Sequence, residues 1–145
     1  MNKAGSGPVR TFEDLECWKQ CRLLRLFVAK EVVPVLPKDE RYRLGDQIRR
    51  AARSTTANIA EGYGRFHYLD NAKFCSNAHG SCWEVLDHLI TGHDEELISA
   101  ELLARGRERV NRAVKLLNGY MNYLKRADNP LPVEPITDNQ PVTSN

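Results

Sequence analysis

The sequence predicts an all-α protein, and more narrowly an antiparallel up-and-down four-helix bundle. Four segments of roughly 22 to 27 residues carry apolar side chains at helical spacing. Glycine or proline residues lie between them, and the alternation of polar and apolar residues that marks strands is absent. Four amphipathic helices joined by short loops bury their apolar faces in such a bundle. The length of 145 residues and the 41% share of hydrophobic residues fit one domain.

The first predicted helix covers residues 12–33. Thr11 is a suitable N-cap with Asp14 three residues later, and Pro34 is expected to end the helix. Its apolar residues form a stripe that is wider than one neighbouring helix requires. The stripe consists of Leu15, Trp18, Cys21, Leu23, Leu24, Leu26, Phe27, Val28 and Val32.

The second predicted helix covers residues 39–61, and the fourth covers residues 99–125. Each has one apolar face at helical spacing. The faces comprise Leu44, Ile48, Ala51, Ala52, Thr55 and Ile59 in the second helix, and Leu103, Val110, Ala113, Leu117, Tyr120 and Leu124 in the fourth. Gly62 and Gly64 are expected to end the second helix through a left-handed conformation, and Ser99 is expected to cap the fourth.

The third predicted helix covers residues 68–91, and its stripe is rich in small side chains. The stripe consists of Leu69, Ala72, Ser76, Gly80, Trp83 and Ile90. Small residues in mid-helix let a neighbouring backbone come close, which offsets the helix cost of glycine of about 1 kcal/mol. We therefore expect a neighbour to pack against this stripe.

Three regions follow from this pattern: a flexible leader (residues 1–10), the bundle (11–127) and a disordered tail (128–145) that holds four of the seven prolines. No apolar run approaches the roughly 18 residues of a membrane span, and the leader has no hydrophobic segment. We expect a cytoplasmic protein with no membrane partner, whose four cysteines stay reduced.

Arginines are the main candidates for function. The formal net charge is only +2, but the tail contains three acids and no base, so residues 1–127 carry +5. Arginine side chains suit phosphate oxygens, and several on a rigid bundle would bind a nucleic-acid backbone. The candidates are Arg41, Arg43, Arg49, Arg50 and Arg53 in the second helix, and Arg105, Arg109 and Arg112 in the fourth. The alternative is a solvated helix face with local ion pairs, for instance Glu101 with Arg105 or Glu108 with Arg112.

Other chemistry has weaker support. Cys75, His79 and Cys82 fall on one side of the third helix, but structural zinc sites usually use close cysteine pairs on turns, and cysteine is commonly buried without a metal. Glu61 more readily caps a helix or pairs with an arginine than acts as a general base. We therefore predict no catalytic residues, no metal site, no cofactor and no enzyme activity.

Several stretches resemble one family, the bacterial four-helix-bundle proteins called 23S rRNA intervening-sequence proteins. The resemblance covers about residues 11–125, and its most specific part is the segment Asn58-Ile59-Ala60-Glu61-Gly62 at a helix end. The other stretches are Phe12-Glu13-Asp14-Leu15 with Trp18, Tyr42-Arg43-Leu44, Gln47-Ile48-Arg49-Arg50-Ala51, Ser54 with Ala57, and Gly80-Ser81 with Glu84.

One branch of relatives fits best, the accessory variability proteins of diversity-generating retroelements. The stretch from Tyr63 to Tyr68, which includes Arg65, is more similar to that branch, as are Asn71, Phe74-Cys75 and Asp87-His88-Leu89. The resemblance implies a barrel-like homopentamer that partners a reverse transcriptase and binds template RNA or cDNA, with Arg65 added to the candidate nucleic-acid contacts. It also offers a neighbouring protomer for the wide stripe of the first helix. The alternative is a homo-oligomeric protein–protein scaffold with no nucleic-acid role.

Overall fold

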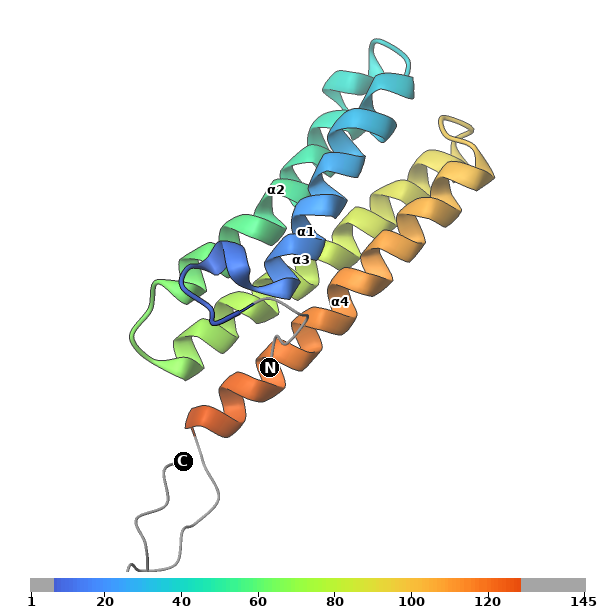
Figure 1. Cartoon of the computed structure of the whole chain (residues 1–145). Helices are drawn as coiled ribbons and strands as arrows, with labels where there is room; N and C mark the ends of the chain where they lie inside the picture. Colours follow the sequence, from blue (N-terminus) through green and yellow to red (C-terminus); the bar gives the residue numbers. More distant parts are fainter. Residues whose placement is uncertain (1–6, 129–145) are drawn as a thin grey trace, which may run out of the picture.

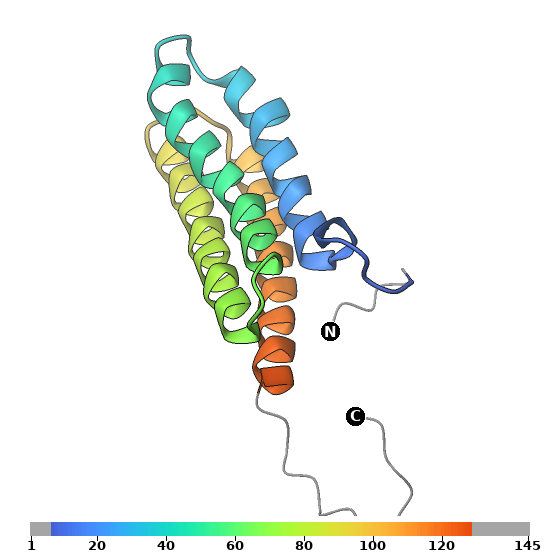
Figure 2. The same ribbon diagram turned by 90° about the vertical axis from the view of Figure 1, so that its left-hand side faces the viewer.

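A computed structural model describes residues 7–128 and shows four helices packed together (Figures 1 and 2). They are α1 (Glu16–Phe27), α2 (Leu44–Tyr63), α3 (Tyr68–Asp94) and α4 (Ala100–Asp128). Successive helices run antiparallel, and the part of the chain that the structure describes contains no strand, which confirms the all-α prediction. Apart from residues 7–10 and 128, the predicted leader and tail lie outside the described residues.

The helices are arranged as a square in cross-section. α1 packs against α2 and α4, and α3 packs against the same two helices, so α2 and α4 occupy opposite corners. The core in the middle draws on all four helices, and its largest fully buried side chains include Leu24, Ile48, Ile59, Leu89 and Leu117. None of the helices described is long and apolar enough to cross a membrane.

The chain around α1 differs from the predicted single helix. Thr11 and Asp14 do form the expected capping box, but it caps a short 3₁₀ turn (Phe12–Asp14). Leu15 is extended, so α1 begins only at Glu16. After α1 the chain continues as a π-helical turn (Val28–Val32) and a 3₁₀ turn (Val33–Val35). Pro34 lies within that last turn, where a missing backbone N–H costs little.

The two ends of α2 also correct the prediction. Residues Glu40–Tyr42 form a separate 3₁₀ turn, and α2 begins at Leu44. At the other end Gly64 has a φ of −76°, so the helix does not end through a left-handed glycine. Gly62 is buried inside the helix, and a Cβ there would lie 2.8 Å from the Oδ1 atom of Asn71. Glycine is therefore required at this position because α3 approaches closely.

The packed face of α3 is not the stripe that the sequence predicted. Leu69 and Trp83 are 57% and 43% exposed, and a Cβ on Gly80 would meet open space. The buried side chains instead include Cys75, Cys82 and Leu89. Ala72 is the one member of the predicted stripe that is buried; cysteine packs as a small apolar residue, and the predicted stripe did not include the two cysteines of this helix.

The predicted apolar faces of α2 and α4 are confirmed as core, with Leu44 and Leu103 only partly buried. The predicted cap of α4 is also confirmed, because the backbone N–H of Leu102 donates to Ser99 Oγ at 3.1 Å. A buried polar chain joins α3 to α4: Asn71 Nδ2 donates to the Tyr120 hydroxyl at 3.1 Å, and the thiol of Cys75 donates to Asn71 Oδ1 at 3.5 Å.

Candidate nucleic-acid interface

Four arginines lie on α1 and α2 where these two helices pack against each other. Arg49 and Arg53 are one turn apart on α2, and Thr56 follows on the same side. Because Arg25 Nη1 of α1 donates to Thr56 Oγ1 at 2.8 Å, this side of α2 faces α1. Arg22 precedes Arg25 by three residues and therefore shares its side of α1. We call Arg22, Arg25, Arg49 and Arg53 the α1–α2 arginine surface.

The charges of this surface are not neutralised by carboxylates. Within residues 7–128, none of its four arginines makes an ion pair, and the hydroxyl that Arg25 contacts is uncharged. Arg22 and Arg53 are exposed, while Arg25 and Arg49 are half-buried. Guanidinium groups in this state retain donors that fit phosphate oxygens in a bidentate manner. The arrangement therefore suits a polyanion.

The remaining arginines predicted for the second helix have other roles. Arg41 lies before α2 and donates to the backbone carbonyls of Leu36 and Pro34, at 3.1 and 3.0 Å, which holds the α1–α2 connection together. Arg43 is exposed, but it is the N-cap residue of α2 rather than part of the helix. Arg43 therefore lies outside the helix in which the sequence analysis placed it.

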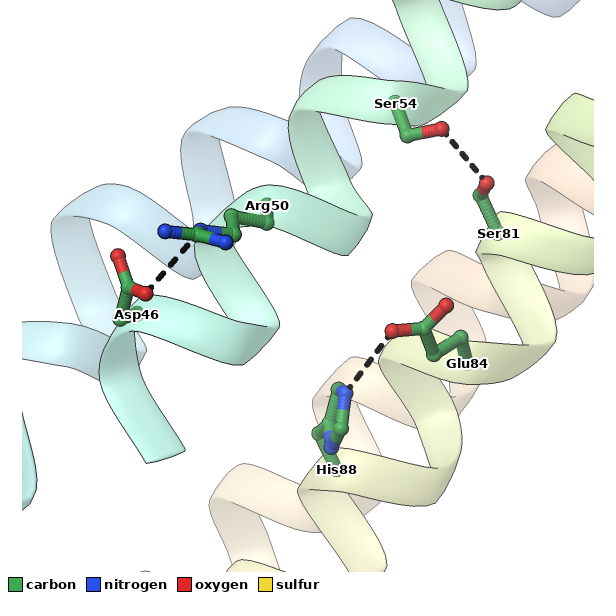
Figure 3. Close-up of polar contacts among 6 residues, drawn as sticks. All are labelled: Asp46, Arg50, Ser54, Ser81, Glu84 and His88. Atoms are coloured by element: carbon green, nitrogen blue, oxygen red, sulfur yellow. Dashed lines mark hydrogen bonds and ion pairs between the residues drawn. The ribbon is translucent and has the colours of Figure 1, made fainter. Parts of the chain in front are cut away.

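The face that α2 and α3 share is mostly neutral (Figure 3). Arg50 forms an ion pair with Asp46 of its own helix at 3.1 Å, and His88 contacts Glu84 at 3.2 Å on α3. Ser54 and Ser81 connect the two helices through a 2.9 Å hydrogen bond between their hydroxyl groups. The guanidinium of Arg50 thus has a carboxylate partner, which leaves it less available to phosphate than the arginines of the α1–α2 arginine surface.

Two of the three arginines predicted in α4 have a carboxylate partner. Arg105 forms an ion pair with Glu31 in the π-helical turn after α1, not with Glu101 as the sequence suggested, and its guanidinium lies 5.5 Å from the centre of the Phe27 ring. Arg112 pairs with Glu108 at 2.8 Å, as predicted. A shallow hollow of about 250 Å³ is lined by Arg105, Glu108, Arg109 and Arg112. Since α4 lies diagonally opposite α2, the two predicted arginine groups do not form one surface.

Arg65 is fixed at the end of α2. It forms an ion pair with Glu61 at 3.2 Å, which confirms the expected pairing of that carboxylate, and its guanidinium lies 4.8 Å from the centre of the Phe74 ring. Arg22 and Arg25 are the members of the α1–α2 arginine surface that sequence reasoning missed. Their spacing of three residues on a predicted helix indicates that they share a side, but the sequence analysis considered only the apolar residues of this helix.

The buried thiols do not form a metal site. Cys75 and Cys82 lie in the core, whereas His79 is half-buried with its ring 6.0 Å from that of Trp83. Among the described residues, no three potential ligand side chains are arranged to hold a metal ion. Burial raises the pKa of the Cys75 thiol to about 12. A hydrogen bond with Cys82, at an Sγ–Sγ distance of 3.9 Å, together with burial, raises the pKa of Cys21. The thiols of Cys21 and Cys75 therefore stay protonated at neutral pH.

Comparison with known proteins identifies the chain at the level of a family. No curated protein matches it. Residues 13–119 match the model of a family described as 23S rRNA-intervening sequence protein, and this match spans the bundle from the first turn to the last part of α4. The chain therefore belongs to the 23S rRNA-intervening sequence protein family.

Proposed function

We propose that the protein is a non-enzymatic accessory protein that binds nucleic acid. The observation that carries this proposal is the α1–α2 arginine surface, whose four guanidinium groups lack a carboxylate partner among residues 7–128. Two packed helices that present several such groups bind a phosphate backbone by charge and shape, with little reading of base sequence. The family description, which names 23S rRNA, fits an RNA ligand.

The proposal predicts how strongly the binding constant should depend on salt concentration. If each of the four arginines neutralises one phosphate of a single strand, the slope of log K against log salt concentration is about −2.8. Raising the salt from 50 to 200 mM then weakens binding roughly 50-fold. A neutral scaffold that contacts nucleic acid through other groups would show a much flatter slope.

The test removes two charges from the α1–α2 arginine surface. Arg49→Gln combined with Arg53→Gln should reduce the steepness of the slope by about 1.4, measured by fluorescence anisotropy with a labelled RNA over a salt series. The matched control, Arg105→Gln combined with Arg112→Gln, removes the same charge from α4, where both arginines are already paired. The control should keep a slope close to that of the wild type. If the slope decreased equally in both variants, net charge alone would determine binding, and the assignment of the α1–α2 arginine surface as the binding site would be refuted.

We further propose that the partner is a reverse transcriptase of a diversity-generating retroelement, which the protein helps to position on template RNA or cDNA. The support is the likeness of residues 63–68, Asn71 and Phe74 to the accessory branch. Co-expression with such an enzyme should yield a complex that survives size-exclusion chromatography. Elution of the two proteins as separate species would leave nucleic-acid binding without this partner.

The assembly proposed from the same likeness is a homopentamer. Leu23 of α1 and Leu69 and Trp83 of α3 are exposed apolar side chains, and burying them against a neighbouring protomer would supply part of an interface. Analytical ultracentrifugation should give five times the monomer mass. The same exposed side chains also favour the alternative function, a homo-oligomeric scaffold. That alternative predicts an oligomer with no affinity for RNA even at 50 mM salt.

A further inference from the structure

The loop between α2 and α3 presents aromatic side chains that the bundle does not use. Phe66 is fully exposed, and Tyr68, the first residue of α3, is 46% exposed. The loop forms one end of the bundle, opposite the α1–α2 connection (Figure 1). A buried phenylalanine side chain stabilises a fold substantially, and this one is left entirely in water. Its exposure therefore calls for a ligand rather than a packing role.

The backbone on the N-terminal side of Phe66 is held firmly. The N–H groups of Gly64 and Arg65 donate to the carbonyls of Ala60 and Gly62, at 3.2 and 3.1 Å. The Arg65 side chain is anchored by its ion pair with Glu61 and by its position over the Phe74 ring. A ring carried on such an anchored segment loses little freedom when it binds a flat partner.

The same helix leads from the α1–α2 arginine surface to this ring. Arg53 and Tyr63 are ten residues apart on α2, which corresponds to about 15 Å along the helix axis. A strand that contacts Arg49 and Arg53 and runs toward the C-terminal end of α2 would approach the loop that carries Phe66. Arg65 and His67 flank the ring in the sequence, and both are exposed. Single-strand-binding surfaces combine a positively charged region, such as the α1–α2 arginine surface, with exposed aromatic rings.

We propose that Phe66 stacks on an unpaired base and that this contact makes the protein prefer single-stranded over double-stranded nucleic acid. The inference rests on the proposed nucleic-acid-binding function. In a duplex the base faces are covered by their neighbours, so only an unpaired base offers its face to the ring. Stacking is tolerant of sequence because every base has such a face. Loss of one stacked aromatic ring typically weakens binding by roughly 5- to 100-fold.

The test compares Phe66→Ala with two other variants. Phe66→Trp keeps a stacking surface, and Val35→Ala removes an apolar side chain that is also exposed, at 56%, but has no aromatic face. Anisotropy measurements use a labelled single-stranded oligonucleotide and a duplex of the same length. The single strand also carries 2-aminopurine, whose fluorescence is quenched when it stacks. The melting temperature should be unchanged in each variant, because neither side chain is buried.

The expected result is a loss of affinity confined to the single strand. Phe66→Ala should weaken single-strand binding roughly 5- to 100-fold and abolish the additional quenching, whereas Phe66→Trp and Val35→Ala should bind like the wild type. Equal single-strand affinity in Phe66→Ala and the wild type would overturn the inference while leaving the proposed function intact. If Phe66→Ala lost the reverse-transcriptase complex but kept its affinity for nucleic acid, the inference would also be overturned, and the ring would be assigned to protein docking. Failure of the wild type to bind either oligonucleotide would overturn the proposed function and this inference together.

Discussion

The close contact of α4 with α1 and α3 at Gly106 predicts a sharp response to one added methyl group. A Cβ at this position would lie 2.4 Å from Leu89 Cδ1 and 3.2 Å from Phe27 Cε2. Carbon atoms prefer separations of about 3.5–4.0 Å, so the leucine side chain would have to move by more than about 1 Å. Leu89 is only 1% exposed, so its side chain cannot move into solvent. Gly106→Ala should therefore overpack the core.

Two opposing terms set the size of this effect. Overpacking a well-packed core costs about 1–3 kcal/mol, while replacing a mid-helix glycine by alanine contributes about 1 kcal/mol of helix propensity. Because Leu89 cannot swing into solvent, we expect the upper part of the first range and a net loss of about 1–2 kcal/mol in the free energy of unfolding. Urea unfolding followed by far-UV circular dichroism measures this quantity.

Gly119→Ala is the matched control. Gly119 lies in the same helix, and a Cβ there would meet no atom within 4 Å. This variant should gain about 0.5–1 kcal/mol, because only the propensity and the entropy of the unfolded chain change. A Gly106→Ala protein that is as stable as the wild type would refute the packing argument. A destabilised Gly119→Ala protein would show that another surface covers this face of α4.

Three further predictions concern the buried polar groups. Tyr120→Phe removes the hydroxyl that accepts a hydrogen bond from Asn71 Nδ2. The free energy of unfolding, measured in the same urea assay, should fall by about 1–3 kcal/mol. An unchanged urea midpoint would contradict the buried hydrogen bond. The pKa of the Cys75 thiol is raised from 9.0 to about 12, so the folded protein keeps a proton that the unfolded chain loses. The contribution of Cys75 to the free energy of unfolding should therefore be constant below about pH 9 and should decrease as the pH rises toward 12. In Cys75→Ala the free energy of unfolding should decrease less steeply over this pH range. All four cysteines are buried, so a thiol reagent such as Ellman's reagent should label the native protein slowly and the denatured protein at once; rapid native labelling would contradict the packed core.

The helices could be predicted from the sequence because apolar spacing alone determines them. The faces of α2 and α4 follow one register over their whole length, and Ser99 has the side chain that a cap requires. Gly62 could not be assigned in the same way. Gly62 is needed because Asn71 of α3 lies close to its backbone, and this contact depends on the tertiary structure rather than on the local sequence. The packed face of α3 was missed for a related reason, since cysteines supply much of its contact.

The candidate site shows why a count of charges predicts so little. Each arginine adds the same formal charge, yet its availability to phosphate depends on the nearest carboxylate after folding. Arg105 pairs with Glu31, which is 74 residues away in sequence, and leaves Glu101 one turn away unused. Residue spacing does not predict that Arg105 pairs with Glu31, because this ion pair depends on the turn after α1 lying beside the first part of α4.

The topology of the bundle then determines which of the available arginines can act together. α2 and α4 occupy opposite corners, so one strand of nucleic acid cannot lie along both on the surface of a single bundle. α1 is a direct neighbour of α2, and the Arg25–Thr56 hydrogen bond ties their facing sides together. The arginines of α1 therefore lie nearer to those of α2 than the arginines of α4 do. The interface that we propose accordingly combines α2 with α1, whose arginines the sequence analysis did not select, rather than with α4.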